Sequence, residues 1–132
     1  MRATIFVVLI AITAAPALAT SGVEGTWRTE AGDEGGYLEI QMGPCESDAS
    51  KTCGIIARAQ GAEGVDPDYE HLGKPMVKDM RPDGKGGFSG GTIWDPQKDK
   101  TYKSKMKLNG DELEVEGCIA FLCDGQDWTR VN

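Results

Sequence analysis

The segment from residue 100 to residue 117 carries the pattern that most constrains the fold. Lysines stand at every second position in its first half and glutamates at every second position in its second half, with mostly apolar residues between them. Alternation with a period of two is typical of β-strands that have one solvated and one buried face. Asn109-Gly110 separates the two halves, and this dipeptide is a strong signal for a two-residue hairpin turn. The segment therefore predicts an antiparallel hairpin with a charged outer face.

A two-residue turn at Asn109-Gly110 also predicts which residues of the hairpin lie opposite each other. A slip by one residue would bury all six charges, so the alternation determines which side of each strand faces the core. The expected pairs are Lys107–Glu112, Lys105–Glu114, Lys103–Glu116, Met106–Leu113 and Ser104–Val115.

The same alternation recurs along the chain. In residues 53–60 it predicts that Ile55, Ala57 and Ala59 face inward while Arg58 faces solvent. Short strands separated by turn residues are typical of all-β sandwiches and barrels. Further strands are expected at residues 23–30, 37–42, 88–95 and 127–131.

Residues 76–80 are compatible with two structures. They fit a strand, and they also fit a helical turn, because Met76, Val77 and Met80 would share one helical face. If they are a strand, the chain has about eight. The 18 glycines and the small number of apolar residues after residue 19 favour a closed barrel, which leaves no sheet edge exposed. The expected fold is a small all-β, antiparallel up-and-down barrel.

Residues 1–19 have the features of a cleaved signal peptide. Met1-Arg2 gives a positive start, residues 4–15 are almost wholly apolar, and Ala17-Leu18-Ala19 has the small-x-small pattern of a cleavage site. The apolar run is shorter than the roughly 20 residues that a membrane-spanning helix needs. We therefore expect residues 20–132 to form one exported domain that does not span a membrane.

Four cysteines in a small exported chain indicate two disulfides. Three pairings are possible. Pairing each cysteine with its neighbour, as Cys45–Cys53 and Cys118–Cys123, would close one polar loop in each of two hairpins. The spacing and context of the four cysteines do not match those of structural zinc sites, so no metal is expected.

Two features resemble those of lipocalin-like barrels. Gly25-Thr26-Trp27 begins the first expected strand, and Arg130 ends the last one. In such barrels the indole packs across the closed end, and a basic side chain from the last strand covers its face. An even number of strands is required for the last strand to run antiparallel beside the first, which favours a strand at residues 76–80.

Nearly all of the chain after residue 19 resembles a family of exported bacterial proteins known as domain of unknown function 2147. The resemblance implies a lipocalin-like barrel in the periplasm or outside the cell, and it implies no catalytic residues. The residues that carry it are Gly25-Thr26-Trp27, Cys53-Gly54, Gly90-Gly91-Thr92-Ile93-Trp94-Asp95-Pro96, Thr101-Tyr102, Gly117-Cys118, Cys123 and Trp128-Thr129-Arg130-Val131.

The candidate ligand-binding residues come from the expected topology. With Trp27 at the closed end, the connections that carry Tyr69, His71 and Trp94 lie at the open end, and Tyr102, Ser104 and Met106 follow one another into the interior. An eight-stranded barrel can hold one small ligand or be filled by its own side chains. A small amphipathic molecule that enters past Tyr69 and Trp94 would find hydrogen-bonding groups at Tyr102 and Ser104.

Other functions have less support in the sequence. The formal net charge of −7 repels nucleic acid and anionic lipid. His71 is the sole histidine, and no catalytic constellation or cofactor motif is visible, so we expect neither an enzyme nor a cofactor. The leading hypothesis is a small-molecule binding protein. The alternative is a filled barrel that acts as a protein-interaction module or inhibitor in the cell envelope.

Overall fold

The computed structural model describes residues 10–11 and 22–132. The signal peptide expected at residues 1–19 lies outside the described residues, apart from residues 10 and 11. Within these ranges the structure has no helix, and thus none that is long and apolar enough to span a membrane. The strands are β1 (Gly25–Arg28), β2 (Tyr37–Pro44), β3 (Thr52–Gly61), β4 (Gly64–Val65), β5 (Pro75–Pro82), β6 (Gly87–Asp95), β7 (Lys100–Asn109), β8 (Glu112–Ile119) and β9 (Leu122–Arg130).

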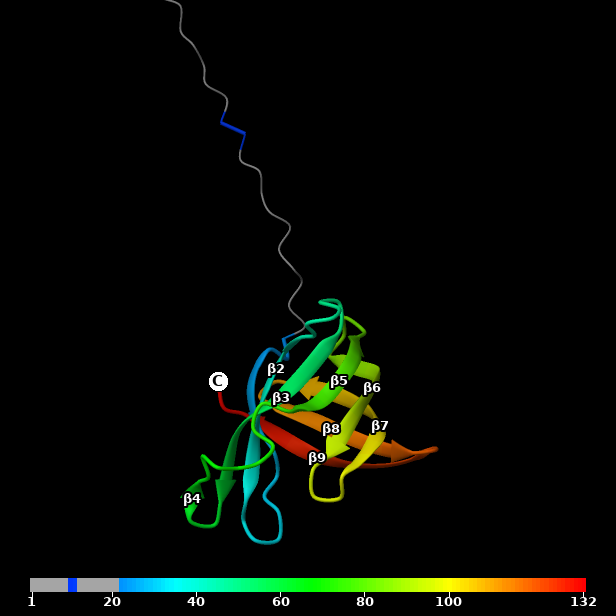
Figure 1. The fold of residues 1–132 in the computed structure, drawn as a ribbon. Coiled ribbons are helices and arrows are strands. Elements are labelled where there is room, and N and C mark those ends of the chain that lie inside the picture. Colours follow the sequence, from blue (N-terminus) through cyan, green and yellow to red (C-terminus); the bar gives the residue numbers. More distant parts are fainter. Residues whose placement is uncertain (1–9, 12–21) are drawn as a thin grey trace, which may run out of the picture.

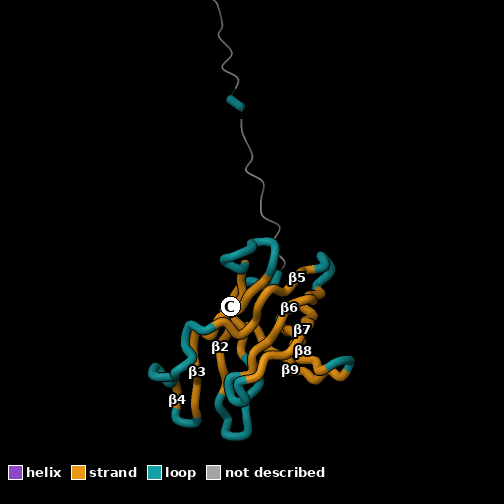
Figure 2. The backbone as a smooth tube through the Cα atoms, turned by 45° about the vertical axis from the view of Figure 1, so that its right-hand side comes forward, coloured by secondary structure: helices purple, strands orange, loops and turns teal. Residues whose placement is uncertain are grey.

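Eight strands close into one antiparallel barrel (Figures 1 and 2). Each pairs with its neighbour along the chain, and β9 returns to pair with β1. The two-residue strand β4 stands outside the barrel wall, where it pairs with the end of β3. The predicted up-and-down barrel is therefore confirmed. Residues 76–80 lie within β5, so the strand rather than the helix is the correct alternative for them.

The closed end of the barrel is built around Trp27, whose side chain is fully buried. Its indole nitrogen donates a hydrogen bond to the carbonyl of Val23 (2.8 Å), and the Arg130 guanidinium lies 4.3 Å from the centre of the ring. Arg130 also donates to the carbonyls of Gly22 and Glu24, and so holds the segment before β1 across this end. Gly25 has a φ of 125°, and a Cβ there would overlap the carbonyl oxygen of Asn132.

The hydrophobic core includes Trp27 and extends along the barrel. Most of its side chains come from the inner faces of the strands, as alternation requires. Two do not: Val23 lies before β1, and Met76 lies on the opposite face of β5 from its neighbour Val77. The core residues are Val23, Trp27, Ile40, Met42, Ile56, Met76, Val77, Met80, Phe88, Met106, Leu113, Val115 and Trp128.

The charged hairpin has the predicted faces but a different register. The two turn residues are Gly110 and Asp111, with Asn109 paired to Glu112, whereas the sequence predicted a turn at Asn109-Gly110. Every pair is therefore displaced by two residues. A displacement by two leaves each side chain on its predicted face, so the hydrophobic pattern cannot distinguish the two registers. The observed pairs include Lys107–Glu114, Lys105–Glu116, Met106–Val115 and Ser104–Gly117.

The observed turn leads to a test by substitution. Gly110 has a φ of 62°, which a residue with a Cβ adopts at a cost. We expect Gly110→Ala to lower the free energy of unfolding by about 1–2 kcal/mol. Asn109→Ala should change it by less than about 0.5 kcal/mol, because Asn109 is an exposed strand residue. Urea unfolding of both variants measures the difference, and equal losses would contradict the observed register.

The predicted inward face of β3 is only partly correct. Ala59 is buried, but Ile55 and Ala57 are exposed, and Ile56 occupies the core instead. Glu39 of β2 pairs with Arg58 and Ile40 with Ile56, so a bulge leaves Ala57 without a partner. A bulge inserts one extra residue and shifts the phase of the alternation. The alternation that places Ala59 inward therefore does not continue through the bulge, and the prediction that Ala57 and Ile55 face inward is wrong.

The first and last strands also differ from prediction. β1 is shorter than the expected segment 23–30, and β9 begins at Leu122 rather than at residue 127. Residues 122–127 are exposed on both faces, so they carry no alternation from which a strand could be predicted. Since β1 pairs with β9 only at Trp27–Arg130 and Arg28–Thr129, the first part of β9 extends beyond β1.

Candidate functional site

Four connections lie at the open end of the barrel, opposite Trp27. They are the β1–β2 connection, the segment between β3 and β5 that includes β4, the β6–β7 turn and the β8–β9 turn (Figure 1). The antiparallel order of the strands places them at the same end. The predicted site residues Tyr69, His71 and Trp94 come from two of these connections or the strand ends beside them.

Three aromatic rings pack against one another there. The His71 ring lies edge-to-face against Tyr69, with centroids 5.3 Å apart, and against Trp94, with centroids 5.0 Å apart. His71 Nε2 lies 3.2 Å from a Glu70 carboxylate oxygen, and the Lys74 ammonium lies 3.0 Å from Nδ1. A neutral imidazole with its proton on Nε2 satisfies both contacts. His71 thus holds the segment after β4 against Trp94, and both of its nitrogens are engaged.

Tyr69 contributes an uncharged hydroxyl to this cluster. Its burial, and after that the negative charges of Glu70 and Asp95, raise the pKa of the phenol above its ordinary value. Desolvation and like charge both disfavour the phenolate. At neutral pH the ring therefore carries a hydrogen-bond donor and no charge.

Trp94 lies on the outer wall of the barrel. It pairs with Thr101 across the β6–β7 ladder, whereas the preceding pair, Ile93 with Tyr102, faces inward. Its indole nitrogen donates to a carboxylate oxygen of Asp99 (2.9 Å), which fixes the ring. The half-buried indole forms one wall of a groove of about 290 Å³. The other lining residues are Lys74, Pro75, Met76, Lys78, Thr92 and Thr101.

The six predicted ligand-binding residues divide into two groups. Tyr69, His71 and Trp94 meet at the open end, and Trp94 opens onto the outer groove. Tyr102, Ser104 and Met106 share the inner face of β7. Ser104 is buried and donates its hydroxyl proton to the carbonyl of Glu116 (2.7 Å), while Met106 belongs to the core. The structure therefore does not bring the six residues around one site.

The groove residues that the sequence did not identify as part of a site are Lys74, Pro75, Met76, Lys78, Thr92 and Thr101. Thr92 and Thr101 share the outer face with Trp94, and they follow from it by alternation once that face is known. The facing of β6 could not be derived from the sequence, because Gly90 and Gly91 give no hydrophobic signal and a bulge lies between Phe88 and Gly91. Lys74 and Lys78 reach the groove from β5 and the loop before it, which only the folded chain reveals.

A second outer groove, of about 400 Å³, lies over the charged hairpin. Charges of both signs line it, among them Lys105, Lys107, Glu114 and Glu116. Lys105 forms an ion pair with Glu116 (3.6 Å), so these charges compensate one another. The groove therefore selects no particular charge in a ligand.

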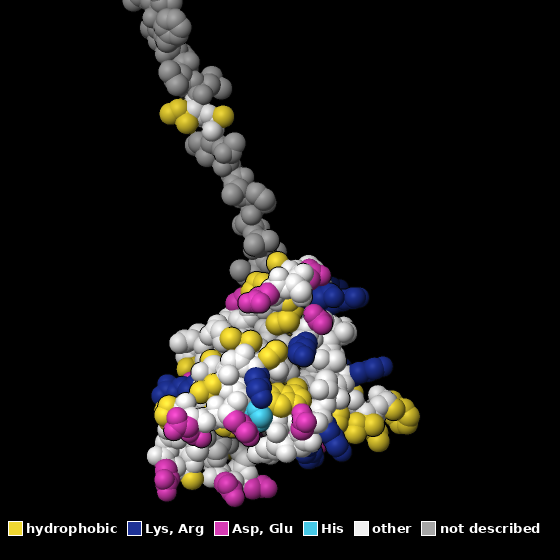
Figure 3. Space-filling view, viewed as in Figure 1, with side chains coloured by type: hydrophobic (Ala, Val, Ile, Leu, Met, Phe, Trp, Pro, Cys, Tyr) yellow, Lys and Arg dark blue, Asp and Glu magenta, His cyan; other side chains and the backbone are white. Residues whose placement is uncertain are grey.

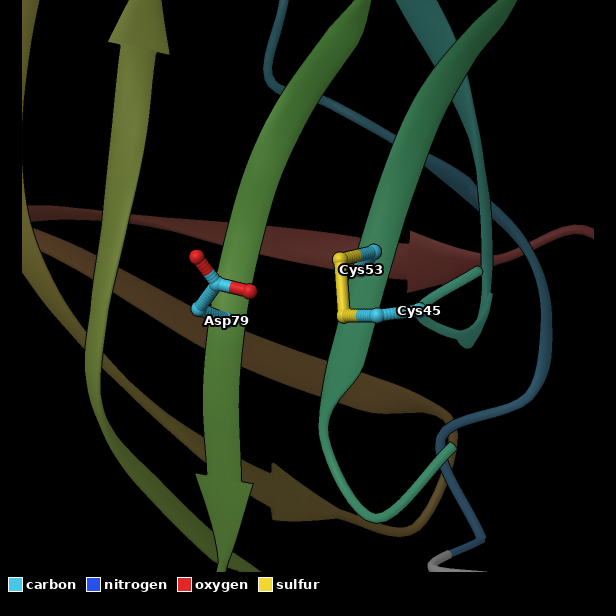
Figure 4. A group of neighbouring side chains, drawn as sticks. All are labelled: Cys45, Cys53 and Asp79. Atoms are coloured by element: carbon cyan, nitrogen blue, oxygen red, sulfur yellow. A yellow bond between two sulfur atoms is a disulfide. The ribbon is translucent and has the colours of Figure 1, made fainter. Parts of the chain in front are cut away.

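Among the residues that the structure describes, two groups of side chains have the residue types of a metal site. Asp79 of β5 lies beside Cys45 and Cys53 (Figure 4), and Glu116 lies near Cys118 and Cys123. Cys45–Cys53 and Cys118–Cys123 are disulfides, so their sulfur atoms offer no thiolate to a metal. The two disulfides also indicate a location outside the cytoplasm.

The closed eight-stranded barrel, with Trp27 and Arg130 at one end, places the protein in the class of lipocalin-like barrels. A solved structure of similar fold is protein HP1028 from the human pathogen Helicobacter pylori, described as belonging to the lipocalin family; the TM-score is 0.64 at 14% sequence identity, over 83% of each chain. This likeness concerns the fold alone. Residues 25–130 match the family described as "Uncharacterized protein conserved in bacteria (DUF2147)", and the chain belongs to that family. No curated protein matches the sequence.

Proposed function

We propose that this protein is an exported bacterial binding protein, periplasmic or secreted, that takes a small amphipathic anion in the groove beside Trp94. The observation that carries the proposal is the composition of this groove. Trp94, Pro75 and Met76 give the groove of about 290 Å³ an apolar lining, and Lys74 and Lys78 also line it. Ligand sites typically combine apolar walls with a few fixed polar groups.

Contacts within the protein hold two of the side chains that line the groove, Trp94 and Lys74. Asp99 binds the Trp94 nitrogen, and His71 packs against the ring while it accepts a hydrogen bond from Lys74. Fixed groups lose little conformational entropy on binding. A carboxylate or sulfonate near Lys74 and Lys78, with a flat apolar group against Trp94, would use all of these features.

The buried core side chains favour this outer site over a deep pocket in the barrel. Phe88, Met106 and Val115 occupy the inner faces of β6, β7 and β8, and Ser104 already has a hydrogen-bond partner. A ligand would have to displace these core side chains. The groove beside Trp94 requires no such change.

Titration with 2-naphthoate, observed through the indole N–H signals in NMR spectra, tests the proposal. Trp27 and Trp128 are buried, so only the Trp94 signal should move, and Trp94→Phe identifies it by its disappearance. We expect Lys78→Glu to weaken binding at least about tenfold, because a charge-assisted hydrogen bond contributes about 1.5–3 kcal/mol.

Two controls make the result specific. Lys107→Glu introduces the same charge change on the outer wall but outside the groove, and it should leave the affinity within about twofold. The neutral analogue 2-naphthalenemethanol should bind more weakly than 2-naphthoate. A Trp94 signal that does not respond to naphthoate or to the corresponding sulfonate at millimolar concentration would refute the proposal.

A further inference from the structure

The tip of the β8–β9 hairpin carries large apolar side chains in full contact with solvent. Ile119, Phe121 and Leu122 are 68%, 91% and 71% exposed. The hairpin projects away from the barrel wall (Figures 1 and 2), and hydrophobic side chains gather at the corresponding edge of the space-filling view (Figure 3). Exposed apolar groups of this size mark sites of interaction with a protein or a membrane.

The fold keeps these side chains exposed. Cys118 pairs with Cys123 across the hairpin, and their disulfide closes a loop that contains only the four residues of the tip. Ile119 pairs with Leu122, and Ala120 between them has a φ of 53°. The disulfide and the short turn restrict the conformations open to the tip, and they support the exposed position of Phe121.

The edge of β9 beside the tip is not arranged to accept another strand. The N–H of Gly125 donates to the Asp124 carboxylate (3.0 Å), and that of Asp127 donates to the Glu30 carboxylate (3.4 Å). Charged residues at a sheet edge oppose pairing with a further chain. Addition of a strand from a second copy would bring together two sets of these acidic residues, which repel each other.

The size and shape of the tip also disfavour a protein interface. Stable interfaces bury about 800 Å² on each partner, over a fairly flat surface. Here the large exposed apolar side chains are limited to three at a protruding turn, while the exposed part of β9 beyond the disulfide carries Asp124, Gln126 and Asp127. Insertion into the surface of a bilayer requires only that such a tip be buried to a depth of about 5–10 Å.

We propose that the β8–β9 tip inserts into a lipid bilayer with electrically neutral headgroups. Lys103 pairs with Cys118 and Asp124 pairs with Gly117, so one charge of each sign lies at the base of the tip. The net charge of −7 repels anionic lipid. Apolar burial of the tip therefore drives the binding. The tip and the Trp94 groove belong to the same end of the barrel, so insertion would hold that end near the lipid surface.

Flotation of the exported protein with phosphatidylcholine vesicles tests this inference. We expect the wild-type protein to float with the vesicles, and Phe121→Asp to lower its partition coefficient at least about tenfold, because the buried Phe side chain is replaced by a charged one. Val65→Asp is the matched control, because Val65 is an exposed apolar residue (46%) on β4, away from the tip. It should bind as the wild type does.

Salt and lipid charge provide a second, independent measurement. Because apolar burial drives the binding, raising the salt concentration should not release the protein, and replacing part of the phosphatidylcholine by phosphatidylglycerol should weaken binding at low salt. Absence of wild-type flotation, or equal binding by the Phe121→Asp and Val65→Asp proteins, would overturn the inference. So would a dimer in lipid-free solution that Phe121→Asp dissociates, because the tip would then bind a second copy. None of these three results would bear on naphthoate binding at Trp94.

Discussion

Replacement of Trp27 by alanine is expected to lower the free energy of unfolding by about 3–5 kcal/mol. The side chain is fully buried at the closed end, so its removal leaves a large cavity there. The same change removes the hydrogen bond to the Val23 carbonyl and the ring over which Arg130 lies. Since small domains are stable by only about 5–15 kcal/mol, this loss is a large fraction of the total.

Urea unfolding followed by circular dichroism measures this change without relying on tryptophan fluorescence. Trp94→Ala is the matched control, because it removes the same side chain from a half-buried position on the outer wall. Its cost should be clearly smaller than that of Trp27→Ala. A loss below about 1.5 kcal/mol for Trp27→Ala would mean that the closed end does not depend on the indole.

Gly91→Ala is the second substitution with a large expected effect. It should lower the free energy of unfolding by about 3 kcal/mol or more. A Cβ at Gly91 would overlap the carbonyl oxygen of Lys78 and would lie 2.8 Å from the carbonyl carbon of Asp79. Asp79 has a φ of 57°, at the point where the backbone of β5 approaches β6. Backbone atoms cannot move aside as a flexible side chain can, so the β5–β6 ladder would have to separate locally.

Gly43→Ala provides the comparison for this effect. Gly43 lies within β2, has no positive φ, and has no atom within 4 Å of the place where a Cβ would stand. It should change stability by less than about 1 kcal/mol. Thermal unfolding of the two variants gives the answer, and similar melting temperatures for both would show that β5 does not approach Gly91 closely.

Regular alternation and sequence motifs predict much of this fold. Lys103, Lys105 and Lys107 face solvent as predicted, and Arg130 covers Trp27 in the way that the Gly-x-Trp motif indicated. The predictions fail where the backbone departs from regular geometry. The bulge at Ala57 reversed the facing of Ile55, and the turn at Gly110-Asp111 displaced a register that the apolar pattern could not fix.

The candidate site could likewise be predicted only where the alternation of the strands is regular. The sequence placed Trp94 near the open end, together with Tyr69 and His71, and the structure brings these three rings together. It could not show which side of β6 Trp94 occupies, since Gly90 and Gly91 interrupt the alternation before it. The two lysines of the groove come from β5 and its preceding loop, and their position beside Trp94 is a consequence of strand pairing across the barrel.

The short seam between β1 and β9 has a consequence for the order of folding. Trp27 in the first strand pairs with Arg130 in the last strand, and Arg130 donates a hydrogen bond to the Glu24 carbonyl, 106 residues away. Contacts between distant residues form slowly, and barrels rich in them fold in roughly milliseconds to seconds. While the chain is being synthesised, β1 has no partner on this side until residues 129 and 130 have been added. The core around Trp27 can therefore be completed only after the last part of β9 has been synthesised, because that part carries the residues that pair with β1.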